Sequence, residues 1–296
     1  MYDMEQLTLI VPAFNEAPAL KDFLPKLLSY CHDNKCNLIL VNDGSTDESR
    51  SLLKEIEPSG YFSVIHHKLN RGYGAAIKSG LVTCTTEYVI TLDADGQHSL
   101  EDVKKLYDLI RLRDADMVVG QRQNMKSGSV YRRIGKWFIR NLARILMTVP
   151  IRDLNSGMKI YRTELAKRYI HLAPDTMSFS DIFTLIFINN RNLVLEEPIH
   201  IQKRKTGKST IGIETAFQTI MEVINIVILF SPMKIFLPLS LLCLLIAAIW
   251  GIPLLIMGRG VTIGTLLGVI LGMLLFLLGL IAEQLSQIRR NQYKTH

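Results

Sequence analysis

Two aspartates separated by one residue, Asp93 and Asp95, are the strongest candidates for chemistry in this sequence. They follow a short apolar run, residues 88–92, so both carboxylates are expected at the end of a buried strand. Keeping two carboxylates ionised there is costly unless a cation neutralises them. A hard divalent ion takes oxygen ligands and also binds diphosphate oxygens, and Gln97 can add a further oxygen. The pattern predicts a Mg²⁺ or Mn²⁺ site.

Two other polar segments follow apolar runs in the same way, residues 12–16 and residues 42–47. Asn15, Glu16 and Asp43 can hydrogen-bond the base and ribose of a nucleoside. Asn15 and Asp43 are also residue types that cap helices, and the two roles are compatible. These segments therefore predict a nucleoside pocket beside the aspartate pair.

A glycine-bearing segment, residues 70–74, precedes a predicted helix. Gly72 and Gly74 can admit a phosphate close to backbone N–H groups at the start of that helix. The segment is not a full G-x-G-x-x-G motif, because Ile77 stands where the third glycine belongs. A dinucleotide-dependent dehydrogenase is therefore not expected.

Alternating strands and helices must position these segments. Apolar runs predict strands at residues 7–11, 37–41, 62–66, 88–92 and 117–119, and the intervening stretches predict helices at 19–31, 48–57, 73–84 and 100–111. This alternation predicts an α/β fold, Rossmann-like, with a mostly parallel sheet covered by helices on both faces. Ligands bind beyond the carboxyl ends of such strands, so the acid-bearing segments are expected along one edge.

The C-terminal part of the chain is almost wholly apolar in two runs, residues 234–257 and 261–282. Each exceeds the roughly 20 residues that a helix needs to cross a bilayer. Basic residues are concentrated before the first run and after the second, so the N-terminal domain and both termini are expected in the cytoplasm. Gly264, Gly268 and Gly272 favour close helix packing, either within a transmembrane hairpin or between subunits of a homo-oligomer.

Two further stretches have the pattern of helices at a membrane surface. One is amphipathic, at residues 213–230, and the other is basic, at residues 131–147. The expected organisation is a cytoplasmic domain at 1–210, an interfacial helix at 211–232, two transmembrane helices at 233–283 and a basic cytoplasmic tail at 284–296.

The composition supports a membrane partner rather than nucleic acid. The 296-residue chain carries a formal net charge of +7, and it shows no nucleic-acid-binding signature. Its four cysteines match no common metal or redox spacing, which favours reduced thiols. The first 30 residues do not have the pattern of a secretory signal.

Four of the segments, in order, resemble the motifs of family-2 glycosyltransferases with the GT-A fold: residues 11–16, 42–47, 70–74 and 93–97. With the two-span tail, the chain resembles the branch that contains dolichol-phosphate mannose synthases and bacterial polyprenyl-phosphate glycosyltransferases. The resemblance implies transfer of one sugar, with inversion, from a nucleotide-sugar donor to a polyprenyl-phosphate lipid. A UDP-hexose such as UDP-glucose is the leading expectation for the donor, with GDP-mannose as an alternative.

The resemblance also implies roles for single residues. The nucleotide-binding set is Pro12, Ala13, Asn15, Glu16, Asp43, Asn70, Arg71, Asp93 and Ala94. The metal-binding set is Asp93, Asp95 and Gln97. The catalytic set is Asp93, Asp95, Asp153, Arg204 and Lys208. The set for the lipid phosphate is Arg122, Arg132, Arg133 and Ser156.

Residues 153–159 resemble the acceptor loop of the family. Met158 replaces the usual aromatic residue, and Lys159 stands at the usual basic position. Asp153 in this loop can orient the acceptor or act as a base, and the sequence leaves both open. Two other functions remain as alternatives. A processive polysaccharide synthase would carry a Gln-x-x-Arg-Trp motif, which is not visible, and an inactive membrane scaffold would not need Asp93 and Asp95.

Overall fold

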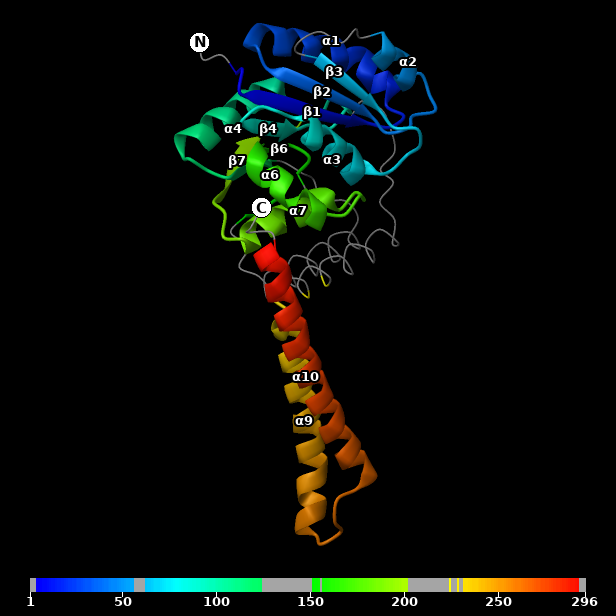
Figure 1. The fold of residues 1–296 in the computed structure, drawn as a ribbon, viewed down its shortest axis with the longest axis vertical. Coiled ribbons are helices and arrows are strands. Elements are labelled where there is room, and N and C mark those ends of the chain that lie inside the picture. Colours follow the sequence, from blue (N-terminus) through cyan, green and yellow to red (C-terminus); the bar gives the residue numbers. More distant parts are fainter. Residues whose placement is uncertain are drawn as a thin grey trace. The chain divides into compact units, whose positions relative to one another are not determined.

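The computed structural model describes residues 4–55, 62–123, 151–154, 156–201, 224, 228 and 231–292. These residues belong to two compact units. The first unit contains the sheet and its helices, up to residue 201, and the second contains the two long C-terminal helices (Figure 1).

One sheet organises the described part of the first unit. Its strands are β1 (Leu7–Ala13), β2 (Asn37–Asn42), β3 (Phe62–His66), β4 (Tyr88–Thr91), β5 (Met117–Arg122), β6 (Lys159–Arg162) and β7 (Val194–Ile199). Their order is β3-β2-β1-β4-β6-β5-β7. Only β6 runs antiparallel to its neighbours among these strands. The predicted mostly parallel α/β sheet is confirmed, whereas β6 and β7 were not predicted.

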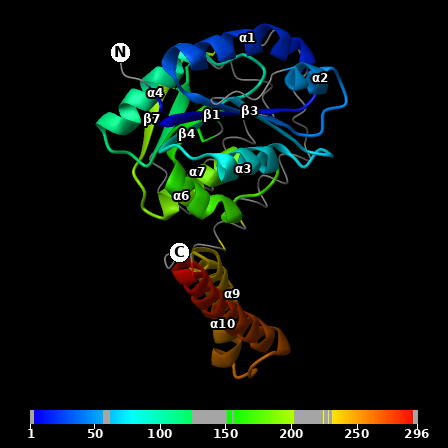
Figure 2. The same cartoon turned by 45° about the horizontal axis from the view of Figure 1, so that its top comes forward.

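Helices cover both faces of this sheet, as predicted (Figures 1 and 2). They are α1 (Ala17–Asn34), α2 (Ser49–Lys54), α3 (Tyr73–Thr83), α4 (Leu100–Leu112), α6 (Thr163–Tyr169), the 3-10 turn η1 (Ile170–Leu172) and α7 (Phe179–Asn189). Helices α1, α2 and α4 share one apolar core with the sheet, and α3, α6 and α7 lie on the other side.

Burial of apolar side chains on both faces holds the central strands in place. Every residue of β1 is buried, which explains its continuous apolar run. On one face Leu9 packs in a core with Leu20 and Leu106, all fully buried, and each such side chain contributes about 1.5–3 kcal/mol. On the other face a Cβ at Gly80 would lie 2.7 Å from Ile10 Cγ2, so the glycine lets α3 approach the sheet closely.

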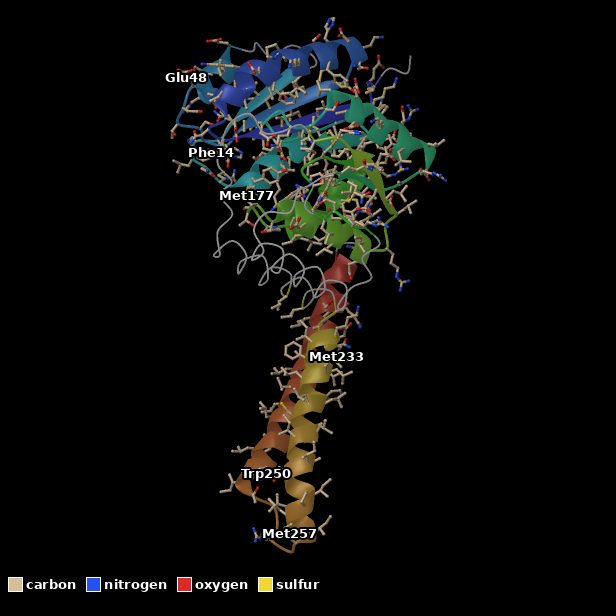
Figure 3. The ribbon with its side chains drawn as sticks, turned by 180° about the vertical axis from the view of Figure 1, so that it is seen from behind. Phe14, Glu48, Met177, Met233, Trp250 and Met257 are labelled. Atoms are coloured by element: carbon tan, nitrogen blue, oxygen red, sulfur yellow. The ribbon has the colours of Figure 1, made fainter. Side chains whose placement is uncertain are left out.

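The second unit is a pair of packed helices, α9 (Met233–Ile256) and α10 (Ile263–Gln292). Both are long and apolar enough to cross a membrane, by length and composition. Large apolar side chains, including Trp250 and Met257, point outward from the pair (Figure 3). Such a surface suits lipid rather than water. Helix α10 continues ten residues beyond the predicted end at Ala282.

Small residues join the two helices. A Cβ at Gly268 would lie 3.0 Å from Ala247 Cβ, and one at Gly272 would lie 2.7 Å from Leu244 Cγ. The hydroxyl of Ser240 donates a hydrogen bond of 2.8 Å to the Gly272 carbonyl. Two of the three glycines in the small-residue pattern therefore pack within the hairpin, one of the two arrangements that the sequence left open.

A bulky residue at Gly251 should destabilise the hairpin. A Cβ there would lie 2.3 Å from Thr265 Cγ2, so Gly251→Ile should cost about 1–3 kcal/mol through overpacking. The measurement is the thermal unfolding midpoint of the full chain in detergent. Gly264→Ile is the matched control, because a Cβ at Gly264 meets no atom within 4 Å. Equal midpoints for the two variants would contradict this packing.

Candidate active site

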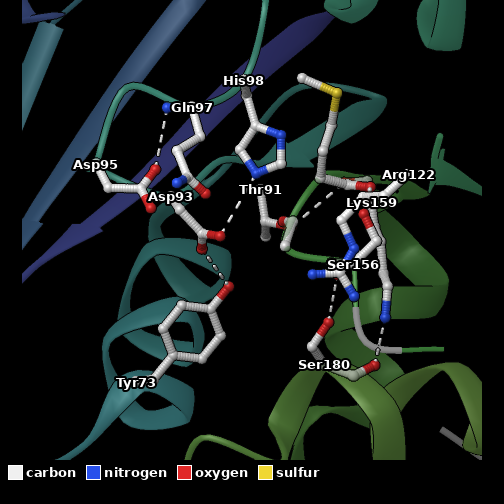
Figure 4. Close-up of polar contacts among 12 residues, drawn as sticks. Tyr73, Thr91, Asp93, Asp95, Gln97, His98, Arg122, Ser156, Lys159 and Ser180 are labelled. Carbon is white, nitrogen blue, oxygen red and sulfur yellow. Dashed lines mark hydrogen bonds and ion pairs between the residues drawn. The ribbon is translucent and has the colours of Figure 1, made fainter. Parts of the chain in front are cut away.

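The aspartate pair lies on the loop that follows β4 (Figure 4). The Tyr73 hydroxyl donates to Asp93 Oδ1 at 3.1 Å, and Asp93 Oδ2 lies 3.4 Å from His98 Nε2. Asp95 Oδ1 accepts the backbone N–H of Gln97 at 3.1 Å, which tightens the loop. The turn therefore gathers the three predicted metal ligands, and Tyr73 and His98 orient the first of them.

Two opposing effects set the charge of Asp93. Burial favours its neutral form, but the hydrogen bonds from His98 and Tyr73 and the positive charge of Arg122 outweigh burial and lower the pKa of Asp93 below its usual value. The carboxylate is therefore ionised at neutral pH, as a metal ligand must be.

The donor set fits a hard divalent ion that is shared with a substrate. Within the described residues no three His, Cys, Asp or Glu side chains form a metal cluster. Asp93 and Asp95 offer carboxylates and Gln97 offers an amide oxygen on the same loop (Figure 4). Mg²⁺ is commonly held by one or two carboxylates together with substrate phosphates and water. These three residues suit that arrangement better than an all-protein cage.

Asn15 connects the loops that follow β1 and β2. Its side-chain Oδ1 accepts the backbone N–H of Thr46 at 2.8 Å, and its own N–H donates to Ser45 Oγ at 3.1 Å. Its backbone has a φ of 55°, a left-handed conformation that asparagine tolerates well. Pro12 and Ala13 lie inside β1 rather than in the loop, and both are buried. Pro12, Ala13 and Asn15, all predicted to bind nucleotide, therefore lie at or next to the carboxyl end of β1.

Asp43 holds the 70–72 segment in place. Its carboxylate accepts the N–H groups of Arg71 at 2.9 Å and Gly72 at 2.8 Å, and it lies 2.7 Å from His67 Nδ1. The other ring nitrogen of His67 lies 2.8 Å from Ser79 Oγ on α3. Asp43 is thus a buried anchor of the segment that contains Asn70 and Arg71, a role that the sequence did not indicate.

The glycines of this segment admit backbone rather than phosphate. The N–H groups of Gly74 and Ala75 donate to the Asp175 carbonyl at 2.9 and 3.3 Å. A Cβ at Gly72 would lie 2.4 Å from the same oxygen. With the N–H groups of Arg71 and Gly72 bonded to Asp43, all four amides are paired within the chain. In this structure these four amides are not free to bind a phosphate, and the hypothesis that the segment binds one stays a prediction.

Arg122 and Asp153 form a bidentate ion pair. Arg122 Nε lies 2.8 Å from Asp153 Oδ2 and Nη2 lies 2.8 Å from Oδ1, while the Arg122 backbone N–H donates to Oδ2 at 3.1 Å. Burial opposes ionisation of Asp153, but the hydrogen bonds and charge of Arg122 outweigh it and lower the pKa of Asp153. The structure therefore pairs Asp153, which the sequence placed in the catalytic set, with Arg122, which it placed in the set for the lipid phosphate.

Lys159 is a fully buried cation behind the acceptor loop. Its Nζ donates to the Leu154 carbonyl at 2.6 Å, the Ser180 carbonyl at 2.6 Å and the Thr184 hydroxyl at 2.7 Å. Burial lowers the pKa of Lys159 to about 7, whereas three acceptors favour the protonated form. Lys159 therefore ties the loop to α7 from within the core.

The acceptor loop lies directly against the aspartate pair. Ser180 Oγ donates to the Ser156 carbonyl at 2.6 Å, and Thr91 Oγ1 donates to the Gly157 carbonyl at 2.9 Å (Figure 4). These bonds place Gly157 so close to Asp93 that an added Cβ would lie 2.1 Å from Oδ2. Ser156 itself is fully buried, which argues against direct contact between its hydroxyl and a lipid phosphate.

Several predicted features lie outside the described residues. They are the basic helix at 131–147, most of the amphipathic helix at 213–230, and the site residues Arg132, Arg133, Arg204 and Lys208.

Comparison with known proteins identifies the first unit. Residues 8–170, over half of the chain, match the family model described as Glycosyl transferase family 2. The chain belongs to this family. It is a glycosyltransferase, and the Asp93 loop and its neighbours are its candidate active site. Residues 231–288 match a second model, described as the GtrB C-terminal hairpin. With helices α9 and α10, this match indicates a membrane protein.

Relatives with curated names are moderately similar to this glycosyltransferase. Dodecaprenyl-phosphate galacturonate synthase of Rhizobium johnstonii is 27% identical over 227 residues, which span 75% of this chain and 66% of that protein. The chain thus spans just under two thirds of that relative. An uncharacterized protein of Methanocaldococcus jannaschii is 29% identical over 233 residues, covering 74% of this chain and 92% of the relative.

Solved structures confirm the GT-A fold. Glucosyl-3-phosphoglycerate synthase from Mycobacterium tuberculosis, in complex with Mn²⁺, UDP-glucose and phosphoglyceric acid, superposes with a TM-score of 0.58 and 16% identity. The match covers 76% of this chain and 82% of that chain. At this identity the likeness concerns the fold alone.

The sequence analysis assigned no role to three residues of the site: Tyr73, His98 and Ser180. Tyr73 and His98 stand inside or beside motifs that the sequence singled out, so their closeness in sequence to Gly72 and Asp95 was a usable signal. Ser180 comes from a segment with no such signal. Lys159 was named as the basic residue of the acceptor loop, but its burial was not predicted, since a lysine is rarely expected in a core.

Gly157→Ala should disable this glycosyltransferase without unfolding it. The added methyl would displace the Asp93 carboxylate, and a misplacement of about 1 Å in an active site can cost about 100-fold in rate. The measurement is metal-dependent turnover of a nucleotide-sugar, with the unfolding midpoint as the control for folding. A folded variant with normal turnover would show that the loop and Asp93 are not coupled in this way.

Proposed function

We propose that this glycosyltransferase transfers a single sugar from a nucleotide-sugar to a polyprenyl phosphate. The observation that carries the proposal is the C-terminal match to the GtrB hairpin, because a membrane-embedded pair of helices suits a lipid acceptor. The relative named dodecaprenyl-phosphate galacturonate synthase supports the same acceptor class. The product would be a lipid-linked sugar for a later glycan-modifying step.

The donor would bind at the sheet edge formed by the loops after β1, β2 and β4. Asn15, Glu16 and Asp43 line the nucleoside side in this proposal, with Asp93, Asp95 and Gln97 holding Mg²⁺ or Mn²⁺. The fold neighbour solved with Mn²⁺ and UDP-glucose supports a divalent ion and a uridine nucleotide. A UDP-hexose is the preferred donor in this proposal. The bound ion would neutralise charge on the departing diphosphate.

The acceptor phosphate would attack the anomeric carbon in one step, with inversion. A phosphate monoester has a second pKa of about 6, so it is already mostly dianionic at neutral pH and needs no base. The lowered pKa of Asp153 makes this carboxylate a poor proton acceptor. Asp153 would instead hold Arg122, whose guanidinium would position the phosphate. Arg204 and Lys208 are proposed to meet the diphosphate.

The membrane orientation is part of this proposal. Lys234 lies in the first turn of α9, and Arg289 and Arg290 lie in the last turn of α10, whereas the short connection between the helices carries Arg259 as its one charged residue. The positive-inside rule then places the catalytic unit and both termini in the cytoplasm, where nucleotide-sugars are available.

Radiolabel transfer tests the proposed reaction. Detergent-solubilised protein is incubated with Mg²⁺ or Mn²⁺, undecaprenyl phosphate and a panel of labelled nucleotide-sugars. A single chloroform-soluble, mild-acid-labile product from one donor is expected, and its identity names the sugar. Asp95→Asn should lower this transfer by about 100-fold or more, because it removes a charged metal ligand.

Two results would contradict the proposal. No lipid product from any donor, with folded protein and metal present, would exclude the lipid acceptor. Near-normal turnover of Asp95→Asn at saturating metal would exclude the metal role of that residue.

Asp153→Asn tests whether Asp153 is a base. A lost general base typically costs about 100-fold to 10,000-fold in rate. We expect a smaller change, with the lipid KM raised about tenfold because Arg122 loses a charged partner. The acid limb of the pH–rate profile should stay near pH 6 in both proteins, because the acceptor phosphate sets it. Asp33→Asn, at an exposed position, is the control. A loss in the base range with an altered acid limb would make Asp153 the base.

A further inference from the structure

A glutamate on β7 binds the start of the acceptor loop. Glu196 pairs with Val119 of β5 in the sheet register, three residues before Arg122. Its Oε1 accepts the backbone N–H groups of both Arg152 and Asp153, at 2.5 and 2.8 Å. One carboxylate oxygen thus fixes two consecutive peptide units.

The same two peptide units position the ion pair at the site. Asp153 carries the carboxylate that binds Arg122 through the side-chain Nε and Nη2 and through the backbone N–H. A continuous chain of contacts therefore runs from Glu196 through the backbone at 152–153 to the Asp153 carboxylate and the Arg122 guanidinium. This series of contacts contains several charge-assisted hydrogen bonds, which are roughly twice as strong as neutral ones.

This series of contacts leaves Arg122 able to bind an anion. A guanidinium has five N–H donors, and Asp153 takes two of them, one on Nε and one on Nη2. The other three donors, all on the two terminal nitrogens, have no hydrogen bond to a residue in the described part of the chain. Their direction depends on where Asp153 stands, and that position depends on the peptide units that Glu196 holds. A phosphate bound by Arg122 would therefore be placed by Glu196 without touching it.

We propose that Glu196 is a positioning residue for the acceptor phosphate, acting through Asp153 and Arg122. This inference rests on the proposed function, in which Arg122 binds that phosphate. It adds a fourth carboxylate to Asp93, Asp95 and Asp153, with a role distinct from theirs. Glu196 acts on backbone amides, so the reach of its side-chain oxygen matters rather than its charge or any proton transfer.

The next residue of the strand provides a matched control. Glu197 has the same side chain and, like Glu196, is partly buried. Successive residues of a strand point to opposite faces of the sheet, so Glu197 is directed away from the face that Glu196 presents. Replacing Glu197 removes the same charge from the same strand and leaves the contact with residues 152 and 153 in place.

Hydrogen exchange tests the contact without relying on activity. The full chain in detergent is compared with Glu196→Ala, Glu196→Gln and Glu197→Ala, and the measurement is amide exchange in a peptide covering residues 152 and 153. We expect exchange about tenfold faster in Glu196→Ala, because both amides lose their acceptor. Glu196→Gln should exchange like the parent, because a glutamine carbonyl oxygen can accept both bonds. Glu197→Ala should also exchange like the parent, because it leaves the Glu196 contact in place.

Steady-state kinetics test the consequence. In Glu196→Ala the KM for polyprenyl phosphate should rise about tenfold, while the KM for the nucleotide-sugar stays within about twofold. Glu196→Gln should restore the lipid KM to near the parent value. A merely structural role would raise both KM values together and would not be rescued by glutamine.

Three outcomes would overturn the inference: unchanged exchange in Glu196→Ala, parallel rises in both KM values, or a folded Glu196→Gln that behaves like the alanine variant. If Glu196→Ala does not fold, Glu196→Gln decides, because faster exchange at residues 152 and 153 or a raised lipid KM in that folded variant would overturn the inference. Failure of the proposed function is distinguishable, because the parent protein would then form no lipid product while the exchange data still report on Glu196.

Discussion

The contact between Gly157 and the Asp93 carboxylate is the constraint on which the rest of the site depends. It joins the acceptor loop to the loop that is proposed to hold the metal, at a distance that leaves no room for a Cβ. Thr91 and Ser180 hold the loop there by its carbonyls, while Tyr73 and His98 hold the aspartate. The loop proposed to bind the donor and the loop proposed to bind the acceptor are thereby fixed to one another.

Charge is concentrated behind this contact, and it is paired throughout the described part of the site. Arg122 faces Asp153, and Lys159 is surrounded by oxygen acceptors in the core. Such buried charges cost desolvation energy and contribute little net stability, but removing one partner leaves the other uncompensated. Their value here is positional. Asp153 fixes the direction of the Arg122 side chain, which is proposed to meet substrate, and Lys159 ties the acceptor loop to α7. The Glu196 contact extends the same principle to the backbone.

The α9–α10 hairpin is held by different physics. Its helices approach closely at Gly251, Gly268 and Gly272, and a serine hydroxyl bonds a backbone carbonyl across the pair. In lipid such close packing and hydrogen bonding take the place of the hydrophobic effect that stabilises the α/β unit. One chain therefore uses two modes of stabilisation, which suits an enzyme whose proposed donor is soluble and whose proposed acceptor is a lipid.

The sequence by itself determined the class of fold, the first five strands, the two long apolar helices and the edge at which Asp93 and Asp95 lie. These depend on local patterns, since apolar runs, turn residues and the carboxyl-end rule act over short distances. Only the tertiary structure showed that Lys159 is buried and that β6 runs antiparallel between β4 and β5. It also showed that Asp43 and Asp175 accept the N–H groups of Arg71, Gly72, Gly74 and Ala75. The tertiary structure also decided that Asp153 binds Arg122 and that Glu196 binds the backbone N–H groups of Arg152 and Asp153. The contacts of Asp43, Asp175, Asp153 and Glu196 join residues 28 to 101 positions apart, and no local pattern encodes which buried polar groups will satisfy one another.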